Sequence, residues 1–426
     1  MLQKIKITGL FGQFDYEIEL KSEGITILTG PNGYGKTTIL KMIHAFATGN
    51  LPFFFRLAFS EIVLVYEKTE FSVSKRSSDL LVFQHGNAKP LELAKDAFHK
   101  AVQQHPRYQK IGENDWLDRA TGIRSTLESL VERSPDDFSQ ILQAYKERIP
   151  DLPAKVYLIQ EQRLIRRSSV RKAAARGFVQ VSLVSGFDDG ENTQGGFINT
   201  IEEYAKELST HIKNTLAEAS KVGQQLDSSF PERLFEEKGS IDKKEFNRRY
   251  DAVRQKQNAL SQYGLSTIRE EKHPSFKEVN ATALRVYLGD TEKKLAVFDG
   301  ILQRLELFSS MLNKKQFAAK GIEISPDFGF RFRIEDGTEL PLTALSSGEQ
   351  QEVILLYELL FQVGSNTLVL IDEPELSLHV AWQKEFLTDL SRIVALQGIM
   401  VMLATHSPDI IGAHWDWVVD LYEISR

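Results

Sequence analysis

The sequence predicts an α/β fold with a mixed β-sheet that carries a phosphate-binding loop. An antiparallel subdomain and an inserted helical, coiled-coil-like arm are expected beside it. Three observations predict it. Residues 30–38 match the pattern G-x-x-x-x-G-K-[ST] between an apolar run and a helix start. A second apolar run, residues 368–371, ends in two acids. Between these features, residues 197–317 are polar and carry apolar residues at helical spacing.

The glycines of the loop allow several backbone N–H groups to point at one anion, and the next helix adds its positive N-terminal dipole. Lys36 is expected to reach the β- and γ-phosphates of a nucleotide, and the Thr37 hydroxyl to bind Mg²⁺. The predicted nucleotide-binding residues of the loop are Asn32, Gly33, Gly35, Lys36, Thr37 and Thr38. A chance glycine-rich turn is the alternative, and the strand–loop–helix context argues against it.

The composition indicates a globular protein with a large core. Of 426 residues, 42% are hydrophobic and 26% are charged, and this length allows two or three domains. The net charge of −6 gives no overall attraction to nucleic acid, so any such site must be local. The chain has no cysteine, which excludes disulfides, thiolate catalysis and cysteine-based zinc sites.

The N-terminus and the apolar stretches predict a cytoplasmic protein without a membrane partner. Residues 1–6 alternate like a strand and do not resemble a signal peptide. The most apolar stretch, residues 51–66, carries Arg56 and Glu61 and is too short to span a bilayer.

Alternating apolar residues predict strands on both sides of the phosphate loop. Three strands are expected within residues 1–30, and further strands at residues 61–66, 71–73 and 80–83. Residues 91–148 are charged and are expected to form a small helical insertion. After Pro150 and Pro153, the chain is expected to return to a strand at residues 156–159.

The middle of the chain is expected to form helices that pack as a hairpin or arm, broken at residues 228–231 and 273–275. The apolar residues at helical spacing include Phe197, Ile201, Tyr204, Leu208, Tyr287, Leu295, Phe298, Leu302 and Leu305. Strands are expected to resume at residues 322–324 and 330–334. The predicted domains are an N-terminal half of the head at 1–196, the helical insert at 197–317 and a C-terminal half of the head at 318–426.

The segment after residue 340 supplies a second set of candidate site residues. Leu345 to Gln351 reads LSSGEQQ and opens a helix that Ser346 and Ser347 can cap, with Glu349 in its first turn. The apolar strand 368–371 is followed by Asp372, Glu373, Pro374 and Glu375.

Each of these acids has an expected role beside a phosphate loop. Asp372 is expected to hold Mg²⁺ and Glu373 to act as general base, with Glu375 as the alternative base. A further strand, residues 399–404, is followed by His406. Because carboxyl ends of parallel strands share one edge, His406 is expected to meet the γ-phosphate or the attacking water.

The most basic run of the chain lies within residues 163–176, where five Arg and one Lys occur without an acid. One interpretation is a solvated loop, and the other is a phosphate-facing patch for nucleotide or nucleic acid. No aromatic residue precedes Phe178 in this run, so base stacking has little support.

The order of phosphate loop, glutamine, LSSGEQ, Asp-Glu and His resembles that of the ATP-binding-cassette ATPases. The resemblance implies that Gln162, with Gln160 as the alternative, contacts Mg²⁺ and the attacking water. It also implies that residues 376–379 are the D-loop and His406 the switch histidine. The signature motif, expected to bind ATP, corresponds to Ser346, Ser347, Gly348 and Glu349. The resemblance covers residues 1–85, 150–185 and 320–426.

The signature motif indicates which branch of that superfamily the chain resembles. LSSGEQ differs from the transporter form LSGGQ and is similar to the RecF, SMC and double-strand-break-repair branch. Residues 371–379 and 404–408 resemble the ATPase subunits of the Septu (PtuA) and PARIS (AriA) anti-phage systems and the ATPase half of the overcoming-lysogenisation-defect nucleases. This resemblance implies an oligomeric ATPase that scaffolds a nuclease. Because 20 residues follow His406, we expect the nuclease to be another chain.

The sequence thus predicts a switch that binds ATP and Mg²⁺, hydrolyses ATP slowly, forms a head-to-tail dimer or larger oligomer, and controls an effector. A RecF-type repair ATPase that binds DNA through residues 163–176 is the main alternative. A transporter subunit is disfavoured by the insert of about 120 residues and by the signature. A nuclease in its own right is disfavoured because no further acidic or His cluster lies outside the expected ATP site.

Overall fold

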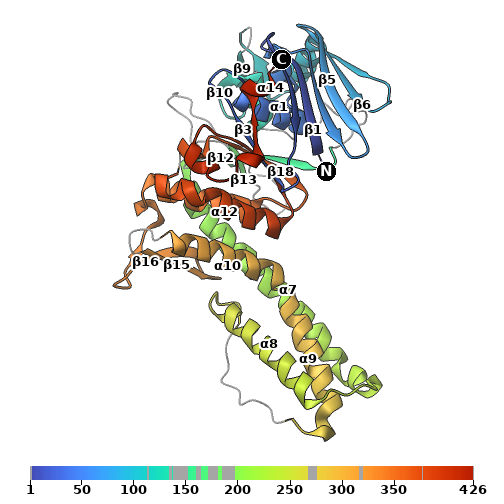
Figure 1. The fold of residues 1–426 in the computed structure, drawn as a ribbon, viewed down its shortest axis with the longest axis vertical. Helices are drawn as coiled ribbons and strands as arrows, with labels where there is room; N and C mark the ends of the chain where they lie inside the picture. The colour runs from blue at the N-terminus through green and yellow to red at the C-terminus, as the bar shows by residue number, and fades with distance from the viewer. Residues whose placement is uncertain are drawn as a thin grey trace. The chain divides into compact units, whose positions relative to one another are not determined.

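The computed structural model describes residues 2–112, 115–133, 137, 152–159, 165–170, 181–184, 197–266, 276–315, 320–376 and 378–425 (Figure 1). They form two compact units, one of Met1–Ile198 with Gln362–Arg426 and the other of Asn199–Phe361. Parallel and antiparallel sheets are both present, and the second unit is mainly helical. The predicted α/β class with a helical insertion is therefore confirmed, while the division at residues 196 and 317 stays a prediction.

A five-stranded parallel sheet carries the phosphate loop. Its order is β11-β18-β19-β3-β20, and each neighbouring pair is parallel. The strands are β3 (Ile25–Thr29), β11 (Lys155–Ile159), β18 (Thr367–Asp372), β19 (Met400–Ala404) and β20 (Val418–Asp420). β3 is buried along its whole length, as expected for a strand covered on both faces. Because all five strands run the same way, the loops after β3, β18 and β19 leave from one edge.

Helix α1 (Lys36–Thr48) begins where the phosphate loop ends and packs on this sheet. Its buried Ile39, Leu40 and Ile43 share a core with Leu28 of β3 and Leu370 of β18. The unit also contains the helices α2 (Leu51–Arg56), α12 (Val380–Gln397), α13 (Pro408–Ile411) and α14 (Leu421–Ile424). Burial of its apolar face therefore holds α1 on the sheet, and this sets the position of the C-terminal end of the phosphate loop.

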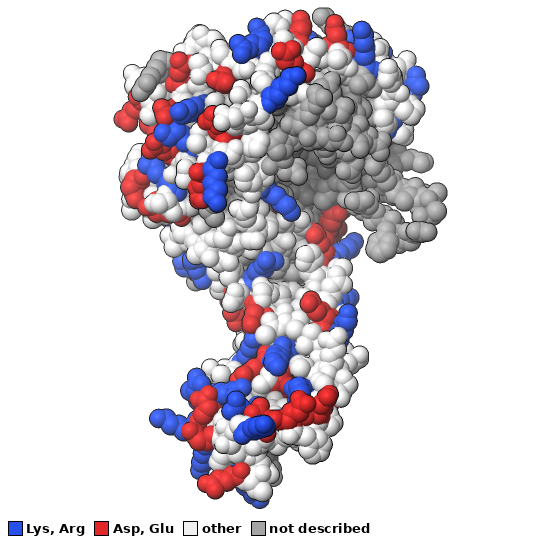
Figure 2. Space-filling model, turned by 90° about the vertical axis from the view of Figure 1, so that its right-hand side faces the viewer, with Lys and Arg blue, Asp and Glu red and all other residues white. Residues whose placement is uncertain are grey.

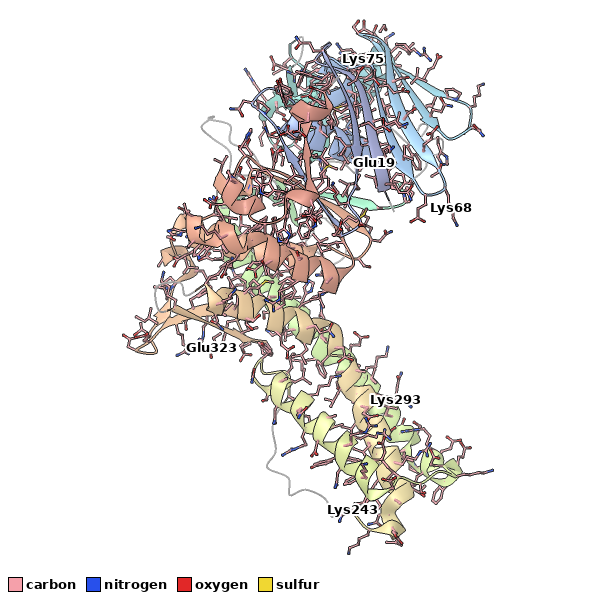
Figure 3. All side chains as sticks on the ribbon, viewed as in Figure 1. Glu19, Lys68, Lys75, Lys243, Lys293 and Glu323 are labelled. Atoms are coloured by element: carbon pink, nitrogen blue, oxygen red, sulfur yellow. The ribbon has the colours of Figure 1, made fainter. Side chains whose placement is uncertain are left out.

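A six-stranded antiparallel sheet forms the predicted subdomain, drawn in blue in Figure 1. Its strands, in spatial order, are β2 (Phe14–Glu19), β1 (Leu2–Leu10), β4 (Glu61–Tyr66), β5 (Glu70–Ser77), β6 (Leu80–His85) and β7 (Leu91–Ala94). The strands expected in residues 1–30 and 61–86 are confirmed. Lys75 of β5, labelled in Figure 3, donates hydrogen bonds to the carbonyls of Phe55 (2.8 Å) and Leu57 (2.7 Å) at the end of α2.

The prediction of a helical insertion over residues 91–148 is wrong in part. Besides α3 (Lys95–Gln104) and α4 (Leu127–Arg133), the segment contains β7 and a small antiparallel sheet of β8 (Tyr108–Lys110), β9 (Asp115–Asp118) and β10 (Ile123–Thr126). Tyr108 and Trp116 are buried, at 2% and 0% exposure, by this packing. Strands of three or four residues are too short to show an alternating pattern in a charged sequence. Residues 113–114, 134–136 and 138–148 lie outside the described part.

Further strands complete the first part of the chain. These are β12 (Ile165–Val170), β13 (Val181–Val184) and β14 (Phe197–Asn199), in the spatial order β13-β12-β14. β12 pairs antiparallel with β13. The strand predicted at residues 156–159 corresponds to β11 and is confirmed.

The second unit contains the predicted helical arm. Its helices are α7 (Thr200–Glu236), α8 (Lys243–Ser261), α9 (Ala281–Ala296) and α10 (Asp299–Lys314). Ion pairs tie α7 and α8 to α9, namely Asp227–Lys294 (2.6 Å), Arg233–Asp290 and Arg249–Glu292 (2.6 Å). On the face shown in Figure 2, Lys and Arg of the arm are interspersed with Asp and Glu, without a continuous basic stripe among the described residues. The expected break at 273–275 lies outside the described residues.

The expected helix break at residues 228–231 is wrong, because α7 runs continuously through Pro231. A proline removes one backbone N–H and crowds the preceding turn, which usually ends or kinks a helix. Here the guanidinium of Arg233 donates to the carbonyl of Leu226 (2.5 Å) and pairs with Asp290 of α9. Tertiary packing against α9 therefore overrides the local signal.

A small sheet and the LSSGEQ helix complete the second unit. The sheet contains β15 (Lys320–Ser325), β16 (Gly329–Ile334) and β17 (Glu339–Leu340), which confirms the two predicted strands. Glu323, labelled in Figure 3, lies on β15. The helix is α11 (Ser347–Tyr357), and a π-helical turn (Glu358–Gln362) follows it. Lys315 and Glu352 form a buried ion pair of 2.6 Å, each side chain 1% exposed.

Gly329→Ala is expected to destabilise the second unit far more than Gly337→Ala. Both glycines have positive φ, 75° and 84°, where a Cβ costs about 1–2 kcal/mol. A Cβ at Gly337 would meet nothing within 4 Å, whereas one at Gly329 would overlap the carbonyl of Ala205 in α7. Overpacking at Gly329 costs about 1–3 kcal/mol more. The free energy of unfolding, measured with urea, should therefore be lower for Gly329→Ala than for Gly337→Ala by that amount. Equal midpoints would contradict the close contact between β16 and α7.

Candidate functional site

The phosphate loop joins β3 to α1, and its last glycine is required by its surroundings. Gly35 precedes the first residue of α1 and has φ 88°, a conformation that side chains with a Cβ rarely adopt. A Cβ there would also lie 2.8 Å from the side chain of Leu10. Asn32 and Gly33 are exposed, and Thr38 is half-buried in the first turn of α1. The middle of the loop is therefore exposed to solvent, whereas the first residue of α1 is buried.

Lys36 is the first residue of α1, and its side chain reaches back to the start of the loop. Its side chain is buried, and its ammonium donates to the carbonyls of Gly30 (2.8 Å) and Pro31 (3.3 Å). Burial lowers the pKa of Lys36 below its usual range, and the nearby carboxylates of Glu373 and Asp372 oppose that decrease. The predicted phosphate-binding cation therefore lies in the electrostatic field of the two predicted acids.

Thr37 and Asp372 meet although 335 positions separate them in the sequence. The Thr37 hydroxyl donates to Oδ1 of Asp372 over 3.0 Å. Thr37 is fixed by α1 and Asp372 by the end of β18, next to β19 in the parallel sheet. A hydroxyl and a carboxylate are the oxygen donors that Mg²⁺ prefers, so this pair fits the predicted metal site.

Glu373 follows Asp372 in a strained backbone conformation. Its φ is 43°, which is rare for a residue other than glycine, Asn or Asp, and its N–H donates to the carbonyl of Ala404 (2.9 Å). Among the described residues, its carboxylate accepts no hydrogen bond. The carboxylate is half-buried and contributes to the electrostatic field at Lys36, and its role as general base stays a prediction.

Glu375, the alternative base, is engaged within the chain. Its Oε1 accepts hydrogen bonds from the Thr405 hydroxyl (2.8 Å) and from the N–H of His406 (2.6 Å). The side chain of His406 is exposed just after β19, at the same edge of the sheet as Asp372 and Glu373. This contact makes Glu373 the better candidate base of the two.

The predicted signature residues lie at the N-terminus of α11 in the second unit. Ser346 accepts the N–H of Glu349 (3.3 Å), and the Glu349 carboxylate accepts the N–H of Ser346 (2.8 Å), which is a capping box. Burial tends to raise the pKa of Glu349, but hydrogen bonds from Lys320 and Ser346 outweigh it and hold the pKa below its usual range. Ser346 and Ser347 are exposed, and Gly348 is half-buried.

The Glu349 carboxylate therefore stabilises the helix start, and its predicted contact with ATP would have to use another atom. Lys320 of β15 lies 2.8 Å from this carboxylate, which fixes it further. Gln160, Gln162, the D-loop Ser377 and most of the basic run lie outside the described residues. Their roles stay predictions.

Sequence reasoning missed the residues that flank the loop from the C-terminal segment. β20 pairs with β3, and Leu421 packs closely against Gly30. The ring of Tyr34, in the loop, lies 5.8 Å from that of Tyr422 and 5.0 Å from that of Phe14. The available signal was an apolar pair, residues 418–419, followed by an acid, as in the strand before Asp372.

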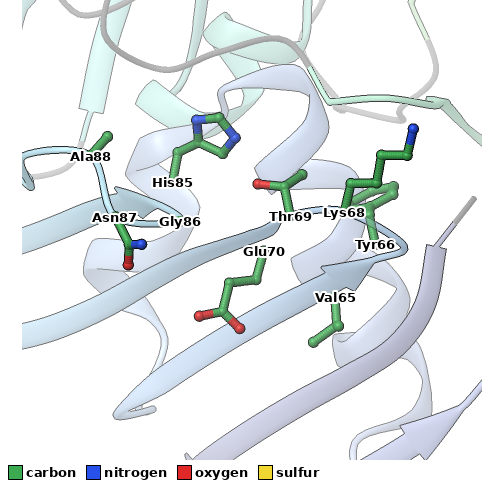
Figure 4. Close-up of a pocket in the computed structure, with 9 residues that line it drawn as sticks. All are labelled: Val65, Tyr66, Lys68, Thr69, Glu70, His85, Gly86, Asn87 and Ala88. Atoms are coloured by element: carbon green, nitrogen blue, oxygen red, sulfur yellow. The ribbon is translucent and has the colours of Figure 1, made fainter.

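A separate hollow of about 600 Å³ lies at the end of the antiparallel sheet, between the β4–β5 turn and the loop after β6 (Figure 4). Its lining includes Lys68, Glu70 and His85 but no residue of the phosphate loop. Within the described residues, no group of three His, Cys, Asp or Glu side chains could hold a metal ion. In that same part of the chain, no helix is both long and apolar enough to cross a membrane.

Comparisons with curated proteins give short local matches. UvrABC system protein A of Pasteurella multocida is 40% identical over 79 residues, 18% of this chain and 8% of that protein. The Aquifex aeolicus protein of the same name is 37% identical over 81 residues, 19% of this chain and 8% of that protein. Protein ea59 of Escherichia phage lambda is 34% identical over 76 residues, 18% of this chain and 14% of that protein. The chain thus spans a small part of these relatives.

Solved structures give similar chains of low identity. The SMC head domain from Thermotoga maritima aligns with a TM-score of 0.34 at 11% identity, covering 97% of this chain and 91% of that chain. An SmcHead bound to the C-winged helix domain of ScpA aligns with a TM-score of 0.38 at 11% identity, covering 99% and 93%. The fold assignment therefore depends on the strand order and registers of this chain itself.

A family model also matches most of the chain. The model described as AAA ATPase domain (AAA_15) matches residues 1–411, which include the phosphate loop, LSSGEQ, Asp372, Glu373 and His406. A match of this extent shows the family directly. The chain belongs to the AAA ATPase domain family.

Proposed function

We propose that the protein is a slowly hydrolysing ATP switch that forms a head-to-tail dimer or larger oligomer and controls a separate effector, a nuclease, in bacterial anti-phage defence. The observation that supports it most is the Thr37–Asp372 hydrogen bond beside Lys36. It brings together the groups that the two halves of the sequence supply. The family supports ATPase activity, while the defence role comes from the resemblance of residues 371–379 and 404–408.

The residues of the loop and of the strand ends would have different roles in ATP binding and hydrolysis. Backbone N–H groups of the loop and the Lys36 ammonium would bind the phosphates. Mg²⁺, held by Thr37 and Asp372 and, on the resemblance, by Gln162, would neutralise phosphate charge when bound. Glu373 would orient the attacking water and accept its proton, while His406 would donate a hydrogen bond to the γ-phosphate.

The signature would complete the site of another subunit. Ser346 and Ser347 are exposed at a capped helix N-terminus, which is a suitable anion site. In the head-to-tail arrangement, Ser346, Ser347 and Gly348 of one chain would contact the ATP bound by a second chain. ATP would then link the two chains, and its hydrolysis would release them.

A RecF-type ATPase that binds DNA directly is the alternative to a switch that controls a separate effector. Its support is the basic run 163–176, whereas the visible face of the arm mixes both charges (Figure 2). Salt-dependent binding of duplex DNA by the purified chain would favour it.

Glu373→Gln is expected to keep ATP bound and to slow hydrolysis by about 10²–10⁴-fold, because the amide cannot accept a proton. Phosphate release would be measured beside equilibrium ATP binding. Asp409→Asn, an exposed change on α13, is the control and should match the parent. Parental turnover in Glu373→Gln would remove Glu373 from this role.

Mixing a Lys36→Ala chain with a Gly348→Asp chain is expected to restore part of the ATPase activity that each lacks alone. One of the two composite sites in a mixed dimer would carry neither change. The rate would be measured across mixing ratios, with each variant alone as control. No recovery at any ratio, together with an ATP-bound monomer by light scattering, would contradict the head-to-tail arrangement.

The purified chain alone is expected to cleave neither plasmid, linear DNA nor tRNA in Mg²⁺ or Mn²⁺, with or without ATP. Among the described residues, the acids and His406 of the ATP site are the candidate catalytic set, so an effector would supply the nuclease. Cleavage that survives further purification and is lost on mutating a residue outside the ATP site would overturn the requirement for a second chain.

A further inference from the structure

The carboxylate of Glu375 holds the loop that carries His406. Oε1 accepts two hydrogen bonds, from the backbone N–H of His406 at 2.6 Å and from the Thr405 hydroxyl at 2.8 Å. Thr405 is fully buried and follows the last residue of β19. Hydrogen bonds to a carboxylate are roughly twice as strong as those between neutral groups. One oxygen atom thus anchors two successive residues of the loop.

Gln383 of α12 fixes the other side of the same loop. Its amide oxygen accepts a hydrogen bond from the Ser407 hydroxyl (2.7 Å), and its amide nitrogen donates to the carbonyl of Glu375 (3.3 Å). Gln383 is 8% exposed. His406 therefore lies between two anchored neighbours, while its own side chain is exposed. Both anchors belong to the segment that follows Asp372 and Glu373.

Glu375 has no part in the ATP chemistry assigned above. Its Oε1 is occupied by the loop, and its Oε2 is buried without a hydrogen-bond partner among the described residues. A half-buried carboxylate costs free energy unless it is well hydrogen-bonded. Its best-supported use is therefore the geometry of the loop and not proton transfer.

We infer that Glu375 is a positioning residue, which sets the place of His406 through its backbone N–H. The inference depends on the proposed function, because it assigns His406 a role in ATP hydrolysis. Since Glu375 lies two residues after Glu373, the same short segment places both the candidate base and the histidine. A displacement of about 1 Å of such a group can cost about 10²-fold in rate.

The test compares Glu375→Ala, Glu375→Gln, His406→Ala and the double variant Glu375→Ala/His406→Ala. Glu375→Ala should lower kcat for ATP hydrolysis by up to about 10²-fold and leave KM for ATP nearly unchanged. The double variant should be no slower than His406→Ala, because both changes remove one function. Glu375→Gln should keep most of the rate, since its amide oxygen can still accept both hydrogen bonds. Asp409→Ala is the matched control.

Hydrogen exchange gives a second readout that does not need turnover. The amide of His406 should exchange faster in Glu375→Ala and in Thr405→Val, but not in Asp409→Ala. If Glu375→Ala does not fold, Glu375→Gln and Thr405→Val still test whether Glu375 holds the backbone of His406.

Three results would overturn the inference. The first is that Glu375→Ala keeps the parental kcat and the parental exchange rate of the His406 amide. The second is that the losses of kcat in the double variant add up. The third is that Glu375→Gln hydrolyses ATP as slowly as Glu375→Ala, which would give the charge itself a chemical role. A parent chain without ATPase activity would count against the proposed function, and the exchange of His406 would still test whether Glu375 holds it.

Discussion

The hydrogen bond between Thr37 and Asp372 is the contact on which the rest of the site depends. It forms because β3 and β18 run in parallel on either side of β19, so the loop after one strand faces the acid at the end of the other. The same edge carries Glu373 and His406. A shift of one residue in either strand would move these groups to different positions, and the buried apolar faces of the strands oppose such a shift.

The second unit shows how the LSSGEQ helix is held by the arm. Three acids of α11 and of the turn after it are engaged by three different elements. These contacts are Glu349 with Lys320 of β15, Glu352 with Lys315 after α10, and Glu358 with Tyr204 of α7. A buried charge that loses its partner is costly, so these contacts tie the helix to the arm and to the small sheet. In the proposed switch, a partner bound on the arm would therefore change the position of the exposed Ser346 and Ser347 through these contacts.

Local patterns in the sequence predicted the main strands, the phosphate loop and the acids after β18, because apolar runs and glycine positions are short-range signals. They did not predict that α7 continues through Pro231, since that depends on contacts of Arg233 with another helix. Nor did they reveal β20, which is three residues long. The engagement of Glu375 by His406 also joins residues far apart in sequence. In each case the deciding contact was tertiary.

The most direct test of the account is the affinity for ATP in the presence of Mg²⁺, measured by calorimetry on the parent, Lys36→Ala and Lys41→Ala. Both lysines belong to α1, but Lys36 is buried in the loop whereas Lys41 is exposed. Hydrogen bonds to a charged group contribute about 1.5–3 kcal/mol, so Lys36→Ala should bind ATP roughly tenfold more weakly or worse. Lys41→Ala should bind like the parent. Unchanged affinity in Lys36→Ala would contradict the assignment of this loop as the ATP site.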